Sequence, residues 1–286
     1  MFVEQLINGL ALGSVYALIA VGYALQLSIL RIYNLAHGEI MMVSTFAAYF
    51  ALEHGAELAL ATAAAVLCGA GLGVLLERLA LRPLKDQGEL APLIVTIGVG
   101  ALLQASAVLA FGFGQRSFPR PATGGFEIGQ AYVTTIQLGV LGVGLLALVL
   151  INLLVQRTRF GRAVRATAEL PSIAQAFGVN ASRITMLTIS LSSGLGALAG
   201  VLIAMNYGVV TPFLGASFAL KALVVVVAGG SGSVNGAFAG GLLLGLLEVL
   251  VAGQWLSEYR DAVAYGLLLL VLAWRPRGLL PSVRVR

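Results

Sequence analysis

The stretch TTIQLGVLGVGLLALVLINLLV, residues 134 to 155, contains no charged residue, and the basic stretch QRTRFGRAVR follows it directly. An apolar run of about 20 residues is long enough for a helix to cross a bilayer core of roughly 30 Å. Arginines and lysines gather at the cytoplasmic ends of such helices. The pattern therefore indicates a helix that crosses a membrane and ends on its cytoplasmic side.

The composition of the whole chain has the same character. Of the 286 residues, 59% are hydrophobic and 10% are charged, whereas a soluble domain carries about 25% charged residues. Eight further apolar segments are predicted to be helices: about 5–29, 36–52, 57–76, 91–113, 184–206, 215–230, 235–256 and 261–274. We therefore predict an all-α fold, a polytopic bundle of about eight to nine transmembrane helices that forms a single domain over residues 1–286.

The segment at 36–52 is short for a span. Its 17 residues would extend about 25 Å at 1.5 Å per residue. It either crosses as a short tilted span or enters and leaves the membrane on one side. The segments at 215–230 and 261–274 are also short, and they leave the span count open by one or two.

The distribution of positive charge predicts the orientation. If the N-terminus lies outside, thirteen lysines and arginines fall in inside loops or the C-terminal tail, and three fall outside. Cytoplasmic loops carry the excess of Lys and Arg. The chain is therefore expected to have its N-terminus outside and its C-terminus inside, and its net charge of +5 reflects topology rather than binding to nucleic acid.

Glycines spaced four apart recur in the apolar segments. Such small-xxx-small pairs let helix backbones approach closely in lipid. The pairs are Gly69/Gly73, Gly196/Gly200, Gly236/Gly240 and Gly241/Gly245. We expect them to mark helix–helix contacts.

The loop at about 156–183 is longer than simple linkage requires. Its sequence predicts two short helices, FGRAVRATAE and PSIAQAFG, with Pro171 in the first turn of the second and Gly178 at its end. The second helix is expected to present Ile173, Ala174, Ala176 and Phe177 on its surface, with few charges to solvate it. A short apolar helix in water is best explained by docking into a groove of a partner.

Four blocks of sequence resemble the branched-chain amino acid ABC-transporter permease family, which includes related urea and amide permeases. The blocks are NLAHGEIMM, ERLALRPLK, RTRFGRAVRATAE and LKALVVVVAGGSGSVNGAFAGG, and they occur in that family's order. The resemblance implies a permease domain in the bacterial inner membrane. It also implies a second related permease subunit, two ABC ATPase subunits, a periplasmic substrate-binding protein and the uptake of small zwitterionic or amide substrates.

Within the loop, IAQAFG is similar to a degenerate form of the motif by which ABC permeases contact their ATPases. The resemblance implies a coupling helix whose residues are Pro171, Ile173, Ala174, Gln175, Ala176, Phe177 and Gly178. ATP and Mg²⁺ would be used by the partner ATPases. We expect no cofactor in this chain, because its glycine-rich stretch AGGSGSVNGAFAGG lacks the G-K-[ST] ending of a phosphate-binding loop.

Polar residues inside apolar segments are candidates for a translocation path or gate. They are Asn34, His37, Glu39, Gln104, Lys221 and Glu248. His37 and Glu39 lie about 200° apart on a regular helix and cannot face one partner, whereas residues 34 and 37 share a face.

A structural role explains the same residues differently. Asn34 would cap the second span, Glu39 would gain from the helix dipole and His37 would bond a neighbouring backbone group. We expect Lys221 to extend toward the outer membrane surface rather than to pair with Glu248, which is the alternative.

The function favoured by these observations is that of a permease subunit of an ATP-driven importer for branched-chain or related small amino acids. Urea or a short amide is the alternative substrate. An ion-coupled secondary carrier that uses Glu39, Lys221 and Glu248 as a relay is the alternative from another class. The chain itself is not expected to be an enzyme, because no nucleophile–base pair or set of metal ligands is visible in the sequence.

Overall fold

The computed structural model describes residues 2–84, 87–88, 90–121, 124–128, 131–230 and 232–254, with the single residues 262, 266, 270, 273 and 274. The helices are α1 (Phe2–Leu30), α2 (His37–Glu53), α3 (Leu58–Leu75), α4 (Leu90–Phe111), α5 (Thr135–Arg157), α6 (Arg159–Glu169), α7 (Pro171–Ala176), α8 (Ala181–Tyr207), α9 (Leu214–Gly229) and α10 (Val234–Gln254). After α3 the chain continues through a wider π-helical turn, η1 (Leu76–Leu81), and a tighter 3₁₀ turn, η2 (Arg82–Leu84).

The first eight predicted apolar segments are each confirmed as one helix. Among the described residues, six helices are long and apolar enough to cross a membrane: α1, α3 continued to Leu84, α4, α5, α8 and α10. The helices α2 and α9 have 17 and 16 residues, about 25 Å of helix each. The ninth predicted segment, 261–274, lies mostly outside the described residues, so a count of eight to nine spans stays a prediction.

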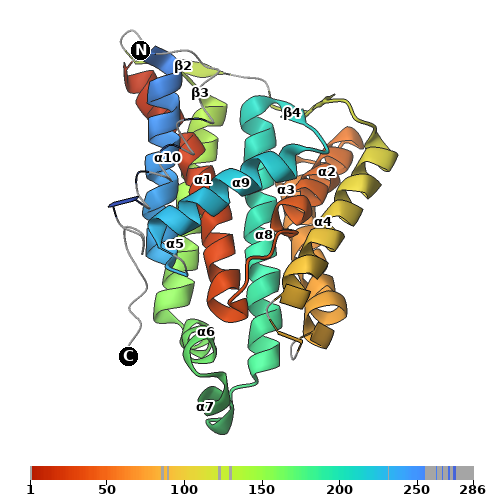
Figure 1. The fold of residues 1–286 in the computed structure, drawn as a ribbon. Helices are drawn as coiled ribbons and strands as arrows, with labels where there is room; N and C mark the ends of the chain where they lie inside the picture. The colour runs from red at the N-terminus through yellow and green to blue at the C-terminus, as the bar shows by residue number, and fades with distance from the viewer. Residues whose placement is uncertain are drawn as a thin grey trace.

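The helices α1 and α8 form the centre of the bundle. In their most apolar windows 89% and 67% of the residues are buried, against 17% for α4. α1 packs against α5, α8, α9 and α10, and α8 packs against α2 and α3. The short helix α9 crosses obliquely in front of α1 and α8 (Figure 1). The outer helices expose leucines such as Leu109, at 88%, which suits a lipid surface and not water.

Close helix contacts form where the sequence places its glycine pairs. Gly241 and Gly245 of α10 lie on the backbone of Ala17 and Gly13 of α1, so that an added Cβ would overlap that backbone. The other pairs behave alike: Gly69 and Gly73 of α3 face α8, Gly196 and Gly200 of α8 face α2, and Gly236 and Gly240 of α10 face α9. The expectation that these glycines mark helix contacts is confirmed.

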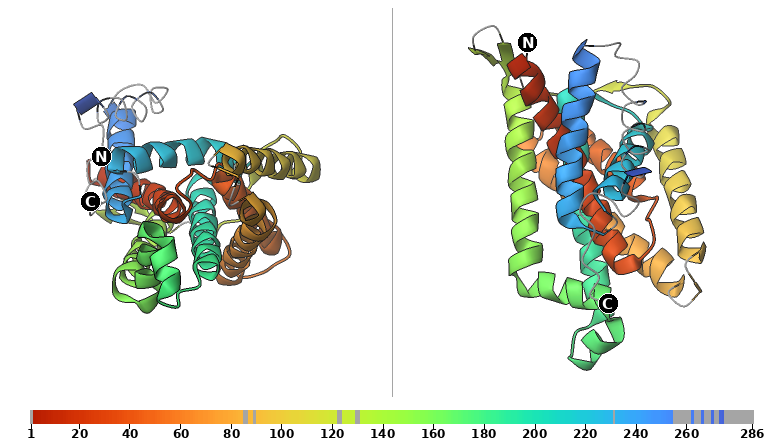
Figure 2. Two further views of the ribbon diagram at one scale, coloured as in Figure 1. Left: turned by 60° about the horizontal axis from the view of Figure 1, so that its bottom comes forward. Right: turned by 60° about the vertical axis from the view of Figure 1, so that its left-hand side comes forward.

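The two ends of the bundle carry different structures. At the end that holds the N-terminus, β2 (Gly125–Ile128) pairs with β3 (Ala131–Thr134), and β1 (Arg116–Ser117) pairs with β4 (Val209–Val210). At the opposite end α6 and α7 project beyond the other helices, as Figure 1 and the right-hand view in Figure 2 show. The predicted two-helix loop is thus confirmed, and it forms a distinct element.

The close contact between α1 and α10 predicts that one added methyl group there lowers the stability of the protein. Gly245→Ala should destabilise the protein by about 1–3 kcal/mol, because the Cβ has no room beside Gly13. Gly142→Ala, on an exposed face of α5 where no atom lies within 4 Å, is the matched control. Thermal unfolding in detergent, followed by size-exclusion chromatography, measures both. Equal midpoints for the two variants would contradict the packing described.

Candidate functional site

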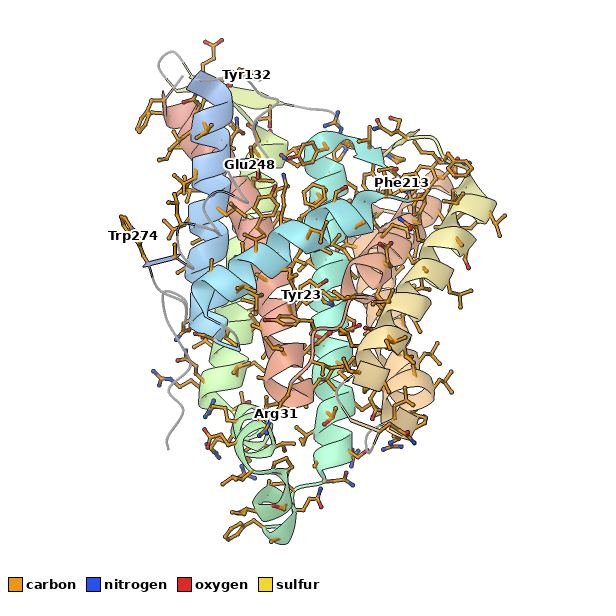
Figure 3. The ribbon with its side chains drawn as sticks, viewed as in Figure 1. Tyr23, Arg31, Tyr132, Phe213, Glu248 and Trp274 are labelled. Carbon is orange, nitrogen blue, oxygen red and sulfur yellow. The ribbon has the colours of Figure 1, made fainter. Side chains whose placement is uncertain are left out.

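The chain interrupts its helix between α1 and α2, inside the bundle. His37, the first residue of α2, packs edge-on against the ring of Tyr23 with centroids 4.6 Å apart. Tyr23 lies eight residues before the Arg31 that follows α1, or about 12 Å along the helix axis. In Figure 3 Tyr23 lies between Arg31, near α6, and Tyr132 at the other end. Residues 31–36 are therefore non-helical backbone that climbs from one end of the bundle toward its middle.

A network of buried side chains forms hydrogen bonds at this interruption. Gln26 of α1 is its centre. Gln26 Nε2 donates to Ser192 Oγ of α8 at 2.6 Å and lies 3.0 Å from His37 Nδ1, while its Oε1 accepts from Asn34 Nδ2 at 2.8 Å. Asn34 Oδ1 in turn accepts from the N–H of Ala36 at 3.1 Å. Non-helical backbone at membrane depth is tolerated only where its polar groups are satisfied inside the protein, and the network does this.

Two expectations for this region are wrong. Asn34 does not cap α2: the N-cap is Ala36, and no side chain caps the helix. His37 does not bond a backbone group; its Nδ1 lies within hydrogen-bond distance of Gln26 Nε2, and its Nε2 is buried. That Nε2 has no partner among the described residues. Both errors have one cause, which is that the sequence did not single out Gln26 or Ser192.

His37 and Glu39 face opposite sides, as their spacing predicts. His37 is fully buried against Gly22 of α1 and Gly196 of α8, where an added Cβ would lie 2.9 Å and 3.2 Å from Nε2. Glu39, 8% exposed, lies between Gly100 of α4 and Gly215 of α9. Gln104 lies half-buried on α4, one turn beyond Gly100.

Lys221 and Glu248 form a buried ion pair, so the expectation that Lys221 extends to the membrane surface is wrong. Lys221 Nζ lies 2.9 Å from Glu248 Oε1, and the hydroxyl of Tyr16 donates to Glu248 Oε2 at 2.7 Å. The carboxylate is 1% exposed. The pair joins α9 to α10 and, through Tyr16, to α1. Two charges in lipid are tolerated when they neutralise one another. The geometry therefore supports a structural role for this ion pair.

The element formed by α6 and α7 has defined ends. Thr158 Oγ1 caps α6 by accepting from the Gly161 N–H at 3.1 Å, and Asn180 Oδ1 caps α8 by accepting from Arg183 N–H at 3.0 Å. Pro171 occupies the first turn of α7. Gly178 has a φ of +82°, which only glycine adopts without strain. The predicted positions of Pro171 in the first turn of α7 and of Gly178 just beyond its end are confirmed.

The surface of α7 is apolar and exposed to solvent. Phe177 is 84% exposed and Ile173 50%, and Gln175 and Ala176 are exposed as well. Ala174 was predicted to belong to the presented face, but it is 5% exposed and packs inward. The nearby Leu170, which the sequence did not single out, is 55% exposed and extends the apolar surface. We call Leu170, Ile173, Ala176 and Phe177 the α7 surface.

Arginines tie this element to the bundle. Arg31 Nη2 donates to the carbonyl oxygens of Ala168 at 3.2 Å and Glu169 at 3.1 Å, the last turn of α6. Such a cation satisfies the free carbonyls at a helix C-terminus and complements its dipole. Arg82 donates to Ser182 at the start of α8. The α7 surface is thus held on a braced support rather than on a free loop.

Comparison with known proteins identifies the family. The family described as branched-chain amino acid transport system / permease component matches residues 5–272. The chain belongs to this family of permeases.

Curated relatives agree over the whole length. The permease is 37% identical to BraD of Pseudomonas aeruginosa and 34% identical to LivH of Escherichia coli K12, in both cases over 98% of this chain and 95% of the relative. Both are named high-affinity branched-chain amino acid transport system permease proteins. A second permease protein of that bacterium, LivM, is 33% identical over 49% of this chain and 32% of its own length. The permease is therefore a transport subunit with several membrane-spanning helices.

The Gln26 network makes a testable contribution to the stability of the permease. Gln26→Leu should lower the free energy of unfolding by about 1–3 kcal/mol, because it leaves buried polar atoms of Asn34 and His37 without partners. Gln104→Leu makes the same chemical change at a half-buried position outside the network and should have little effect. Thermal unfolding in detergent measures both. If the two variants melt together, Gln26 is not the centre of the network.

Proposed function

We propose that this permease is one of two related permease subunits of an ATP-driven importer that carries branched-chain or related small amino acids across the bacterial inner membrane. The observation that carries the proposal is the exposed α7 surface, braced on α6, in a chain of the branched-chain amino acid permease family. The family implies ATPase partners, and a short apolar helix in water needs a groove to cover it.

Arginine placement supports the proposed orientation of the chain in the membrane. Arg31 and Arg82 contact the end of the bundle that carries α6 and α7, and α6 itself adds Arg159, Arg162 and Arg165. Arg116 and Arg120 lie at the opposite end, with the strands. An excess of arginine marks the cytoplasmic side. The α7 surface then faces the cytoplasm and the N-terminus of α1 faces the periplasm.

A second permease subunit follows from the relatives. Escherichia coli has two permease proteins of this transport system, LivH and LivM, and both resemble this chain. A heterodimer of permeases, two ATPases and a periplasmic binding protein form the complete importer in this proposal. Substrate specificity then resides largely in the binding protein, and the permease needs only a weakly binding path.

The mechanism is alternating access driven from outside the chain. Closure of the ATPases on ATP moves α7, and α6 transmits the movement as a rigid body to α5, α8 and, through Arg31, to the end of α1. The alternative of an ion-coupled carrier loses two of its three relay residues, because Lys221 and Glu248 neutralise one another, which leaves only Glu39.

Co-purification tests the proposal. The tagged chain, isolated from its native cells in a gentle detergent, should retain two ATPase polypeptides or two copies of one, and a second permease, identified by mass spectrometry. Phe177→Asp should release most of the ATPase, because it places a charge on the α7 surface.

Ser172→Asp is the matched control: it adds the same charge to an exposed position in the first turn of α7, where a helix tolerates an acidic residue well. It should retain the ATPase. Full retention in Phe177→Asp, or equal loss in both variants, would contradict docking through the α7 surface.

A further inference from the structure

The carboxyl group of Glu39 lies buried where α2, α4 and α9 meet, away from the Gln26 network. Its Oε2 atom is buried and has no hydrogen-bond partner among the described residues. An added Cβ at Gly215 would lie 2.7 Å from this oxygen, and one at Gly100 would lie 3.5 Å from Glu39 Cγ. Two of its neighbours are thus glycines, which present backbone rather than a side chain to the carboxyl group.

The start of α9 lies against this carboxyl group and is itself incomplete. Like α2, α9 begins without a side-chain cap. The N–H groups of Leu214 and Ser217 bond the carbonyls of Thr211 and Phe213. Within the described residues, the N–H groups of Gly215 and Ala216 have no acceptor. A buried helix start with free N–H groups favours an anion.

An unpaired carboxylate beside unpaired backbone N–H groups is complementary to a zwitterion, which carries one positive and one negative group. An ammonium group supplies donors for the carboxylate, and a carboxylate supplies acceptors for the N–H groups. Interrupted helices near the middle of a membrane bind amino acid substrates by this combination of helix starts and polar groups. Urea and other neutral amides lack both charges and would satisfy neither partner fully.

We propose that Glu39 and the first turn of α9 at Gly215 and Ala216 form a transient site for the zwitterionic end of an α-amino acid. Glu39 accepts from the ammonium group, and the two N–H groups donate to the carboxylate. This inference rests on the proposed function, since it places the amino acid substrate on the transport path.

Access to the site requires movement of α9. Glu39 is 8% exposed. Gly38 packs closely on Gly215, because a Cβ added at Gly38 would lie 2.6 Å from the Gly215 carbonyl oxygen. Phe213, just before α9, lies near the end that carries the strands (Figure 3), and Tyr23 lies beside Gly38 and Glu39. Separation of α9 from α2 opens the site, and close packing of the two helices closes it, as alternating access demands.

Equilibrium binding to the importer isolated from its native cells and washed free of the periplasmic binding protein, which would itself bind leucine, tests the site. The probes are labelled leucine and 4-methylpentanoate, which keeps the apolar chain and carboxylate of leucine but lacks its ammonium group. The wild-type importer should bind leucine with a Kd in the millimolar range and prefer it at least about 10-fold over 4-methylpentanoate, as expected for a charge-assisted hydrogen bond. Glu39→Gln should reduce that preference to about 2-fold or less.

The preference ratio separates binding from a purely structural role. A structural role of Glu39 would weaken both ligands equally or leave the ratio unchanged, and either result overturns the proposal, as does the lack of saturable leucine binding in the wild type. Glu57→Gln, an exposed carboxylate at the start of α3, is the charge-matched control and should keep the ratio.

A second pair of variants decides the matter if Glu39→Gln fails to assemble. Gly215→Ala places a methyl group against the carboxylate and should weaken leucine binding about 10-fold or more. Gly98→Ala, on α4 where no atom lies within 4 Å, should bind as the wild type does. Equal binding by these two variants overturns the proposal. Failure of the proposed function would show separately, as an isolated complex that lacks ATPases or does not take up leucine.

Discussion

The structure depends on hydrogen bonds to the backbone polar groups that are freed where a helix is broken inside the membrane. Lipid offers no water to the backbone between α1 and α2, so the polar groups freed there must bond within the protein. Gln26 meets this constraint by reaching α2 and α8 at once, through His37 and Ser192, and the connecting segment through Asn34. The position of α2 on α8, and hence of α3 and α4 outside it, follows from this network.

The same interruption connects the middle of the bundle to its cytoplasmic element. Arg31, the residue that ends α1, has a left-handed backbone with φ 58° and binds the last carbonyls of α6. The chain then climbs to Asn34 and the start of α2. One short segment thus contacts the support of the α7 surface at one end and the buried network at the other. In the proposed mechanism, a displacement of α6 therefore acts on the chain where the helix is interrupted between α1 and α2.

Features that depend on local sequence were predictable. The apolar runs, the glycine pairs, Pro171 and Gly178 each carry their own signal within a few residues, and the structure confirms the helices, contacts and helix ends that they predict. The opposite orientation of His37 and Glu39 also follows from helix geometry alone. Resemblance to a family supplied the partners, which no spacing in this chain encodes.

Features that depend on contacts distant in the sequence were not predictable. Lys221 and Glu248 come from different helices, and only the crossing of α9 and α10 brings them together. Gln26 appears in the sequence as one polar residue in a long apolar run, and its importance lies in Ser192, 166 residues away. Ala174 is as apolar as its exposed neighbours, yet it is buried where α7 packs against α6 and α8.

Transport into proteoliposomes that contain the complete importer tests the central claim, that movement in this chain is driven by ATP used elsewhere. With binding protein and labelled leucine outside, uptake should require ATP on the side of the ATPases and continue when ionophores remove every ion gradient. Uptake that proceeds without ATP and stops when the gradients are removed would contradict the account.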